Sequence, residues 1–185
     1  MKRGISVVGG FAALLVLSTP AFAQQTRKVA VTATAPSGIG ILWHVSDQVA
    51  VRPEFSFQRT STETSGATVV PGTATSWLLG SGGSLLFYTG KWDNLRAYVS
   101  PRFTFAHTKS TSTTGSTSSN PTSYTLSGSA GAQYSLGDRF AVFGEWGLNY
   151  GWQSASYTSS IPASSFTTKT SAFGTGTRIG VAIYF

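Results

Sequence analysis

The stretch from Phe140 to Trp152 alternates between two kinds of side chain. One set is large and mostly apolar, and comprises Phe140, Val142, Trp146, Leu148, Tyr150 and Trp152. The positions between them hold mostly small or polar residues, together with one acid, Glu145, and one large apolar residue, Phe143. Because a strand places alternate side chains on opposite faces, this pattern predicts a strand with one apolar face and one narrow face. A soluble sandwich would expose a charged second face to water. The small second face favours a closed sheet whose apolar side meets lipid.

Similar units repeat along the chain. Short turn-like segments that contain Asp lie at 45–48, 91–94 and 136–139, and an alternating strand follows each of them. Stretches dominated by Ser and Thr occupy residues 60–75, 108–122 and 153–168. Tight turns at one end and long polar loops at the other are typical of outer-membrane barrels.

This pattern predicts an all-β fold, a closed antiparallel up-and-down transmembrane β-barrel with short periplasmic turns and long extracellular loops. The expected strands are 48–60, 76–90, 94–107, 122–135, 139–152 and 169–185. Segment 27–44 must then supply two short strands, divided by "PSG", to give eight. Pro53 and Pro101 each delete a ladder hydrogen bond, and both are expected to mark bulges on the lipid face.

The N-terminus predicts export. Lys2 and Arg3 precede an apolar segment at 11–17, and "AFA" at 21–23 is a small-x-small cleavage site. These features predict a signal peptide over residues 1–23 and leave 24–185 for the barrel. The chain has no cysteine, so it can form neither a disulfide nor a thiolate metal site. Its two His and six acids show no ligand spacing, so no metal or other cofactor is expected. The basic residues are scattered, which argues against nucleic acid as a partner.

Charged residues share the parity of the narrow face on four strands. This set comprises Arg52, Glu54, Arg96, Arg102, Glu145 and Arg178. The set can be interpreted as a pore filter or proton path, or as a mutually paired plug that compensates buried charge. The small interior of an eight-stranded barrel favours the plug.

Aromatic residues cluster towards both ends of the predicted strands. Those beside the long polar segments are Trp77, Tyr150 and Trp152, and those beside the short turns are Trp43, Tyr88 and Trp92. Two such groups predict the aromatic girdles that lie at the two bilayer interfaces.

The repeated segments "RPEFSF" and "SPRFTF", the signal ending "AFA" and the terminal "RIGVAIYF" resemble a known family. The chain is similar to the small, eight-stranded outer-membrane β-barrel proteins of Gram-negative-type bacteria. The resemblance implies a location in outer-membrane lipid and a barrel that can close as a monomer. It also implies that the barrel-assembly machinery recognises the last strand, with Ile179, Val181, Ile183 and Phe185 as the assembly signal.

The resemblance leaves the physiological role open. The leading hypothesis is a non-enzymatic barrel with a structural role or a surface-loop interaction with an unidentified extracellular ligand. A narrow passive ion channel is an alternative, and four inward Arg against two Glu would favour anions. Some barrels of this family are enzymes that modify lipid A, and His107 is the candidate catalytic residue for such an activity. The Ser expected two residues later is missing, however, and Glu63 is the only acid in the polar segments. A soluble secreted β-sandwich is the last alternative.

Overall fold

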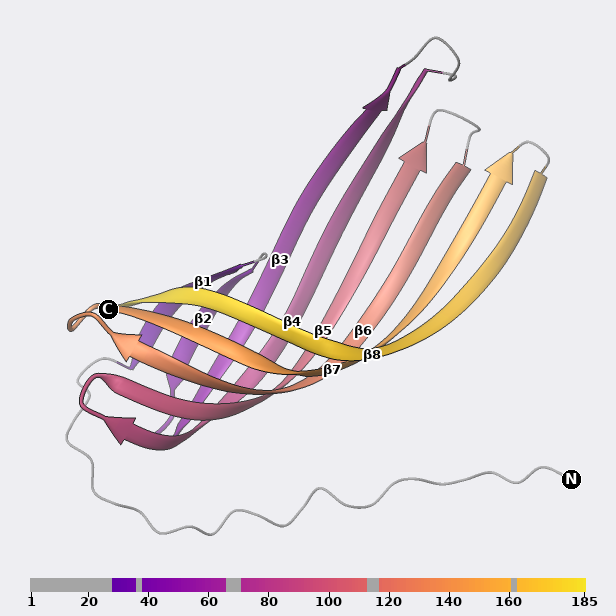
Figure 1. Ribbon diagram of the computed structural model, residues 1–185. Helices are drawn as coiled ribbons and strands as arrows, with labels where there is room; N and C mark the ends of the chain where they lie inside the picture. The colour runs from indigo at the N-terminus through magenta and orange to yellow at the C-terminus, as the bar shows by residue number, and fades with distance from the viewer. Residues whose placement is uncertain (1–27, 36–37, 66–70, 113–116, 161–162) are drawn as a thin grey trace, which may run out of the picture.

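The computed structural model describes residues 28–35, 38–65, 71–112, 117–160 and 163–185. It contains eight strands, which are β1 (Val29–Ala35), β2 (Ile39–His44), β3 (Val49–Thr64), β4 (Gly72–Trp92), β5 (Leu95–Ser112), β6 (Thr117–Ser135), β7 (Phe140–Ser160) and β8 (Ala163–Tyr184). Each strand pairs antiparallel with the next, and β8 returns to pair with β1, so the sheet closes into a barrel (Figure 1). The predicted eight-stranded up-and-down barrel, including its short first hairpin, is confirmed.

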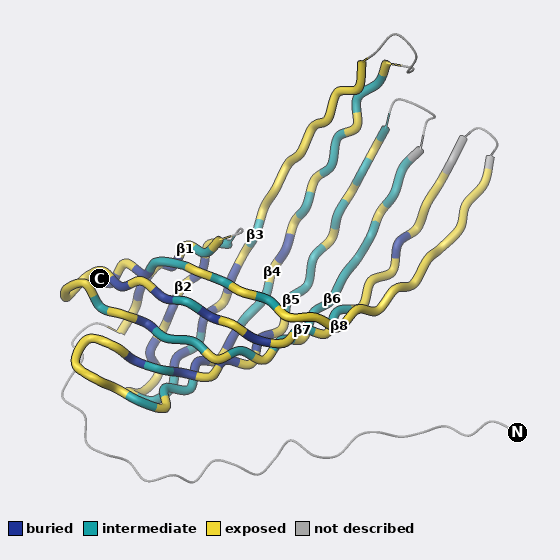
Figure 2. Tube along the Cα trace, in the orientation of Figure 1, coloured by how far each residue is buried: buried dark blue, intermediate teal, exposed yellow. Residues whose placement is uncertain are grey.

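The strands alternate between an outward apolar face and an inward face, as the sequence pattern predicts. Small and medium apolar side chains such as Ala50, Leu86 and Ala182 are buried inside. Large ones such as Trp146 and Phe173 are 59% and 71% exposed on the outside. Figure 2 shows the buried positions concentrated around the closed part of the barrel, with few of them in the outer parts of β3 to β8. The apolar side chains therefore form an outer belt, and polar groups fill much of the interior.

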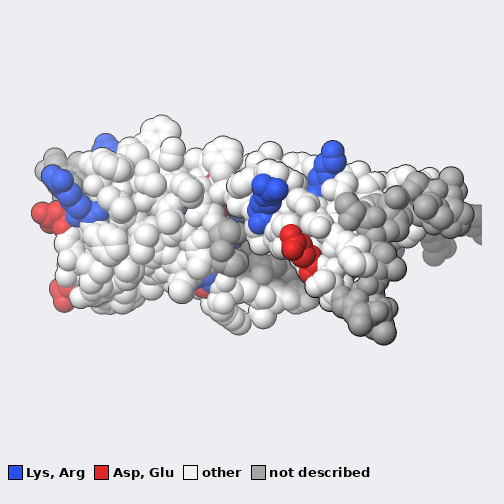
Figure 3. All heavy atoms as spheres, turned by 90° about the horizontal axis from the view of Figure 1, so that it is seen from above, with Lys and Arg blue, Asp and Glu red and all other residues white. Residues whose placement is uncertain are grey.

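The outward apolar belt has the height of a membrane. At ~3.3 Å per residue and a tilt of ~40°, the run from Phe140 to Trp152 spans about 30 Å along the barrel axis. Figure 3 shows a broad stretch almost free of charged side chains between the charges at the short-turn end and those of the outer extension. Within the described ranges, no helix is long and apolar enough to cross a membrane.

The polar segments that the sequence assigns to long loops are strands instead. The β3–β4 ladder continues as far as Thr64↔Gly72, the β5–β6 ladder reaches Ser112↔Thr117, and the β7–β8 ladder reaches Ser160↔Ala163. Ser and Thr alternate on both faces there, and Thr in particular suits a strand that is solvated on both sides. The described residues that the sequence assigns to long loops are therefore strand residues, and β3 to β8 carry a tall polar extension (Figure 1).

The prolines do not mark bulges, contrary to the prediction. Around Pro53 the β2–β3 ladder keeps one register from Gly40↔Glu54 to Trp43↔Val51, and the β4–β5 ladder likewise keeps its register across Pro101. Each proline faces outward and lies in a short interruption of one ladder, so the missing N–H needs no extra residue. The irregularity in the described ladders lies instead between Tyr88 and Gly90 of β4. That bulge shifts the inward and outward faces by one residue.

Candidate functional site

Five charged side chains meet in the middle of the barrel interior. They are Arg52 and Glu54 from β3, Arg102 from β5, Glu145 from β7 and Arg178 from β8. Their strands are spread around the ring, so the cluster crosses the lumen from wall to wall. It holds three cations against two anions. We call these five residues the lumen cluster.

Glu145 is the most enclosed acid of the lumen cluster, with 1% of its side chain exposed. Its Oε1 accepts hydrogen bonds from Arg52 Nη2 at 2.5 Å and from Tyr98 Oη at 2.9 Å. Its Oε2 accepts one from Arg102 Nη2 at 3.0 Å. Gly131 on the neighbouring strand makes this possible, because a Cβ there would lie 2.8 Å from the Tyr98 ring and 2.9 Å from Glu145 Cγ. A missing side chain on β6 thus creates the room for the charge on β7.

Glu54 is shared by three arginines. Its carboxylate lies 3.0 Å from Arg52 Nε, 3.2 Å from Arg102 Nε and 2.9 Å from Arg178 Nη1. Arg52 also donates to Ser84 Oγ at 3.2 Å, and its guanidinium lies 5.0 Å from the centroid of the Phe143 ring. Each guanidinium is therefore compensated by carboxylate, which is the condition for keeping charge inside a protein.

A second layer lies between the lumen cluster and the short turns. Tyr88 Oη donates to Gln133 Oε1 at 3.1 Å, and Gln133 Nε2 donates to Tyr184 Oη at 2.7 Å. The Tyr184 hydroxyl also lies 3.1 Å from His44 Nε2. The His44 and Tyr88 rings stack with centroids 5.4 Å apart. This hydrogen-bonded aromatic layer closes the base of the lumen beneath the ions.

Arg96 belongs to this second layer and lies outside the lumen cluster. Its guanidinium lies 3.7 Å from the centroid of the Tyr88 ring and donates to the Asp47 carbonyl oxygen at 2.5 Å. The sequence groups Arg96 with the other inward ions because parity gives the face of a residue but not its height along the barrel.

Sequence reasoning missed the uncharged members of the interior. Tyr98 is buried and donates a hydrogen bond to Glu145. Gln133 and His44 are also buried, and both are hydrogen-bonded to the buried Tyr184 hydroxyl. The signal that could have found them is parity. Tyr98 has the parity of Arg96 and Arg102, and Tyr184 has that of Arg178, so both were bound to face inward.

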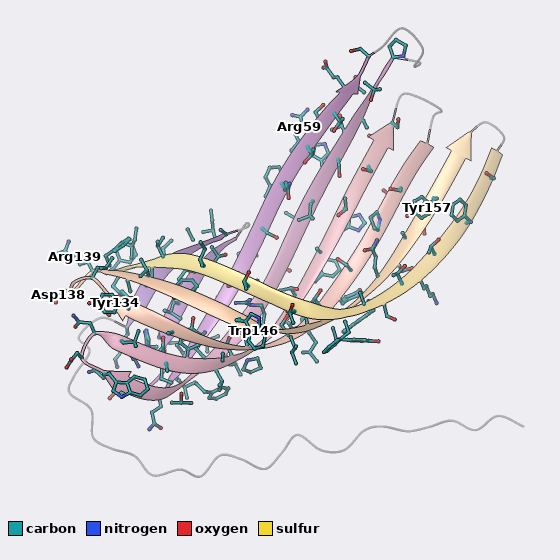
Figure 4. The ribbon with its side chains drawn as sticks, viewed as in Figure 1. Arg59, Tyr134, Asp138, Arg139, Trp146 and Tyr157 are labelled. Carbon is teal, nitrogen blue, oxygen red and sulfur yellow. The ribbon has the colours of Figure 1, made fainter. Side chains whose placement is uncertain are left out.

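Five of the six residues predicted as aromatic girdles lie on the outward face. Trp43 and Trp92 are exposed near the short turns, while Trp77, Tyr150 and Trp152 lie near the outer edge of the belt. Trp152 stacks on Tyr124 with ring centroids 5.7 Å apart. Figure 4 places Trp146 on the wall between these levels and Tyr134 beside the turn that carries Asp138 and Arg139.

Tyr88 is the exception, because it lies inside the barrel with Gln133 and Arg96. Tyr88 and Trp92 have even numbers, yet the bulge after Tyr88 shifts the register so that Gly90 pairs with Ala97. Tyr88 therefore faces inward and Trp92 faces outward. The assignment of Tyr88 to a girdle is wrong for this reason.

The C-terminal residues form the part of β8 that closes the ring. Ile179, Val181 and Ile183 face outward and lie opposite Ala35, Ala33 and Val31 of β1. Phe185 follows the last strand residue and is 71% exposed. Residues 1–23, predicted as a signal peptide, lie outside the described residues.

His107 lies on the outward face of β5, where its Nδ1 is 3.0 Å from Thr122 Oγ1. It pairs with Leu79, and Leu79 pairs with Phe57, whereas Glu63 lies about 20 Å further along β3 at ~3.3 Å per residue. The structure therefore does not bring this His and this acid together. Among the described residues, no group of three or more His, Cys, Asp or Glu side chains could hold a metal ion.

Solved structures of outer-membrane proteins are similar to this chain. A major outer membrane protein from Thermus thermophilus aligns over 86% of this chain and 100% of its own, with a TM-score of 0.55 and 12% identity. CarO from Acinetobacter baumannii aligns over 85% of this chain and 97% of its own, with a TM-score of 0.45 and 11% identity. No protein-family model and no curated protein sequence matches the chain. The ladder and the first of these similarities together establish that the chain has the fold of an outer-membrane β-barrel.

Proposed function

We propose that the chain is a non-enzymatic integral outer-membrane protein whose plugged barrel anchors a polar β-sheet platform outside the cell. The observation that carries this proposal is the lumen cluster, which crosses the interior where a conducting channel would need water. The role is structural or interactive, and the ligand of the platform is an extracellular molecule.

The outer surface of the barrel supports the membrane location. Outward side chains are apolar over about 30 Å, which matches the hydrocarbon core of a bilayer. Exposed tryptophans flank this belt at both ends, as expected where a barrel crosses two interfaces. Exposed apolar residues at this density would make a soluble protein aggregate.

The interior supports a closed lumen. The carboxylates of Glu54 and Glu145 are held by three arginines, and these side chains are at most 25% exposed. Tyr98 links this cluster to the aromatic layer beneath it through Glu145. An ion that crossed the barrel would have to separate several buried ion pairs, each of which is expensive to break.

The outer extension supports the platform. Beyond the apolar belt, β3 to β8 carry Ser and Thr on both faces, and the few charges, among them Arg59, Lys109 and Lys169, have the outward parity. Tyr157 and Phe166 on the inward side stack with ring centroids 4.9 Å apart. Figure 4 shows Arg59 and Tyr157 in this extension, far from the short turns. The strands of the extension stay paired up to their last described residues, which makes this surface rigid. A rigid surface can bind a ligand without the entropy loss of ordering flexible loops.

Planar-bilayer recording in concentrated KCl tests the closed lumen. We expect no stepwise current from the refolded wild-type protein. We expect conduction from a variant in which Ser replaces the long side chains of both layers that fill the lumen: Arg52, Glu54, Arg102 and Glu145 of the lumen cluster, and Tyr88, Gln133 and Tyr184 of the aromatic layer. A control with Arg59→Ser and Glu63→Ser removes two charges from the outer extension and should remain silent. Stable anion-selective steps from the wild type would contradict the proposal and favour the ion channel.

The C-terminal strand is proposed to act during assembly. We propose that the barrel-assembly machinery binds the outward residues Ile179, Val181, Ile183 and Phe185. Because β8 pairs with β1 of the same chain, the proposed unit in the membrane is the monomer.

A further inference from the structure

The first hairpin ends well below its neighbours and leaves the barrel wall incomplete on one side. The β1–β8 ladder stops at Ala35↔Ile179, and the β2–β3 ladder stops at Ile39↔Phe55. Above these pairs, β3 and β8 continue with outward apolar residues, Phe57 and Phe173, which are 61% and 71% exposed. The outer part of each of these strands is exposed throughout (Figure 2). In the part of the chain that the structure describes, the wall therefore has a side opening between β3 and β8 that begins within the apolar belt.

The edges of this opening carry backbone groups that need partners. Within the described residues, no strand pairs with β3 beyond Phe55 on its β2 side, or with β8 before Ile179 on its β1 side. Hydrocarbon does not tolerate an open sheet edge, because each unsatisfied N–H or C=O costs several kcal/mol there. An occupant that is polar towards the barrel and apolar towards the membrane would shield part of these edges from the hydrocarbon.

The floor of the opening is positively charged. Arg178 is the residue directly before the last β8–β1 pair, and its Nη1 reaches across the hairpin to Glu54 on β3 at 2.9 Å. Its side chain is 25% exposed, against 1% for Arg52 and 6% for Arg102. The lumen cluster has one more cation than anions, and Glu54 is already shared. The most accessible cation of the lumen cluster thus lies directly below the opening.

There is free space above Arg178 on the inner side of β8. Gly174 lies further out on the same face of the strand, and a Cβ placed there would meet no atom within 4 Å. Gly176 between them and Ala172 beyond them also carry minimal side chains. Asn149 of β7 pairs with Gly174, and its amide group occupies the space beside Gly176, where an added Cβ would clash with Nδ2. The inner side of β8 beyond Arg178 is therefore lined by small side chains and by the Asn149 amide, and it is open at Gly174.

From these observations we infer that the side opening binds a single-chain anionic amphiphile from the outer leaflet. Its anionic head group pairs with Arg178 and accepts from the backbone N–H groups of the strand edges. Its alkyl chain leaves between β3 and β8 into the hydrocarbon of the membrane. The inference rests on the proposed membrane location but does not require a particular ligand for the outer platform.

A second copy of the chain fits the opening less well. A strand added to either edge would satisfy backbone groups, yet it would bring no anion to Arg178. The outward residues at this edge include Phe57 and Phe173, which suit an alkyl chain, and the inward residues of β8 directly beyond Arg178 are small and uncharged. The combination of one charged contact with an apolar exit is the chemistry of an amphiphile.

Calorimetric titration of the refolded protein in neutral maltoside micelles tests the inference, with laurate as the probe. Two control ligands each represent one part of laurate: acetate has the carboxylate without the long chain, and dodecanol has the chain without the carboxylate. We expect one laurate bound per chain and little binding of the other two. Arg178→Gln should weaken laurate binding ~10-fold or more, which corresponds to the loss of a charge-assisted hydrogen bond. This variant should fold, since it leaves two arginines against two glutamates.

A second variant reduces the free volume of the site and leaves its charge unchanged. Gly174→Leu fills the site where a Cβ has free room, and we expect it to weaken laurate binding to a similar degree. Gly128→Leu is the matched control, because Gly128 also has free room but faces outward on β6. Arg59→Gln is the matched control for the charge. A boiled-versus-unboiled gel shift confirms that each variant is folded.

Several results would overturn the inference. Unchanged laurate binding in both Arg178→Gln and Gly174→Leu would do so, as would equal losses in the two controls. Acetate that binds as tightly as laurate would reveal an anion site without an amphiphile. A stable dimer with no laurate binding would show that a second copy covers the edges. None of these results bears on conductance, so the closed-lumen proposal stands or falls separately.

Discussion

Replacement of Glu145 by Gln should test how far the lumen cluster stabilises the barrel. The Glu145 side chain is 1% exposed and accepts hydrogen bonds from Arg52, Arg102 and Tyr98. Gln keeps the volume but removes the charge, so three arginines must then share the carboxylate of Glu54. The remaining cluster carries two uncompensated positive charges in a space that water reaches poorly.

Removal of one partner from a buried ion pair typically costs ~3–5 kcal/mol. The amide oxygen of Gln can still accept one hydrogen bond, so we expect a loss near the lower end, about 3 kcal/mol. Urea unfolding of the barrel in lipid vesicles, followed by the gel shift and by tryptophan fluorescence, measures the free energy of unfolding. The control is Glu63→Gln, which alters an exposed acid of the outer extension and should leave that free energy unchanged.

A double variant that removes one cation and one anion distinguishes the effect of buried charge from the effect of packing. Arg52→Met combined with Glu145→Met removes one cation and one anion and leaves Arg102 and Arg178 with Glu54. Apolar side chains of similar size can replace a buried ion pair at little cost, and Phe143 lies beside Arg52 to contact them. We expect the double variant to be more stable than Glu145→Gln. A loss below ~1 kcal/mol for Glu145→Gln, or no recovery in the double variant, would refute the role given to the buried charges.

Two further predictions concern the two ends of the barrel, the C-terminal residue and the outer extension. Phe185→Ala should lower the amount of heat-modifiable protein assembled in the outer membrane of cells, yet leave refolding into detergent unchanged, because the Phe185 side chain is largely exposed and contributes little to packing. Equal losses in cells and in detergent would show that Phe185 stabilises the barrel and does not act as a signal. Trypsin added to intact cells should leave the chain uncut at Lys109 and Lys169, because both residues are paired within ladders, with Trp77 and Ser154. Rapid cleavage after either lysine, seen by mass spectrometry, would indicate loops instead of the strand extension.

The closed barrel could be predicted from the sequence because two strong patterns agree. Alternation fixes the face of each residue, and Asp-containing turns recur at one end of the strands. The run from Phe140 to Trp152 needs no tertiary information to be assigned as a strand with an outward apolar face. The same parity predicts that Glu54, Arg102 and Glu145 face one interior, although their strands, β3, β5 and β7, are separated in the ring by β4 and β6.

The length of the strands could not be predicted, because the composition of their outer parts is ambiguous. Segments such as 108–122 consist largely of Ser and Thr, a composition shared by flexible linkers and by strands that are solvated on both faces. Pairing between neighbours decides the matter, and pairing is a tertiary property. The bulge in β4 was hidden for a similar reason. A single inserted residue reverses the faces of Lys91 and Trp92 relative to Tyr88, but it leaves no mark in the composition.

The β1–β2 hairpin also governs when the fold can be completed. Strands β2 to β8 pair with neighbours in sequence, so those ladders can form locally and early. Ring closure alone joins the two ends of the chain, and it relies on a seam of six residue pairs between β1 and β8, from Ala30↔Tyr184 to Ala35↔Ile179. The first strand to leave the ribosome must therefore wait for the last before the barrel can seal. Of the long-range steps in folding, this one should be the slowest to form and the first to come apart.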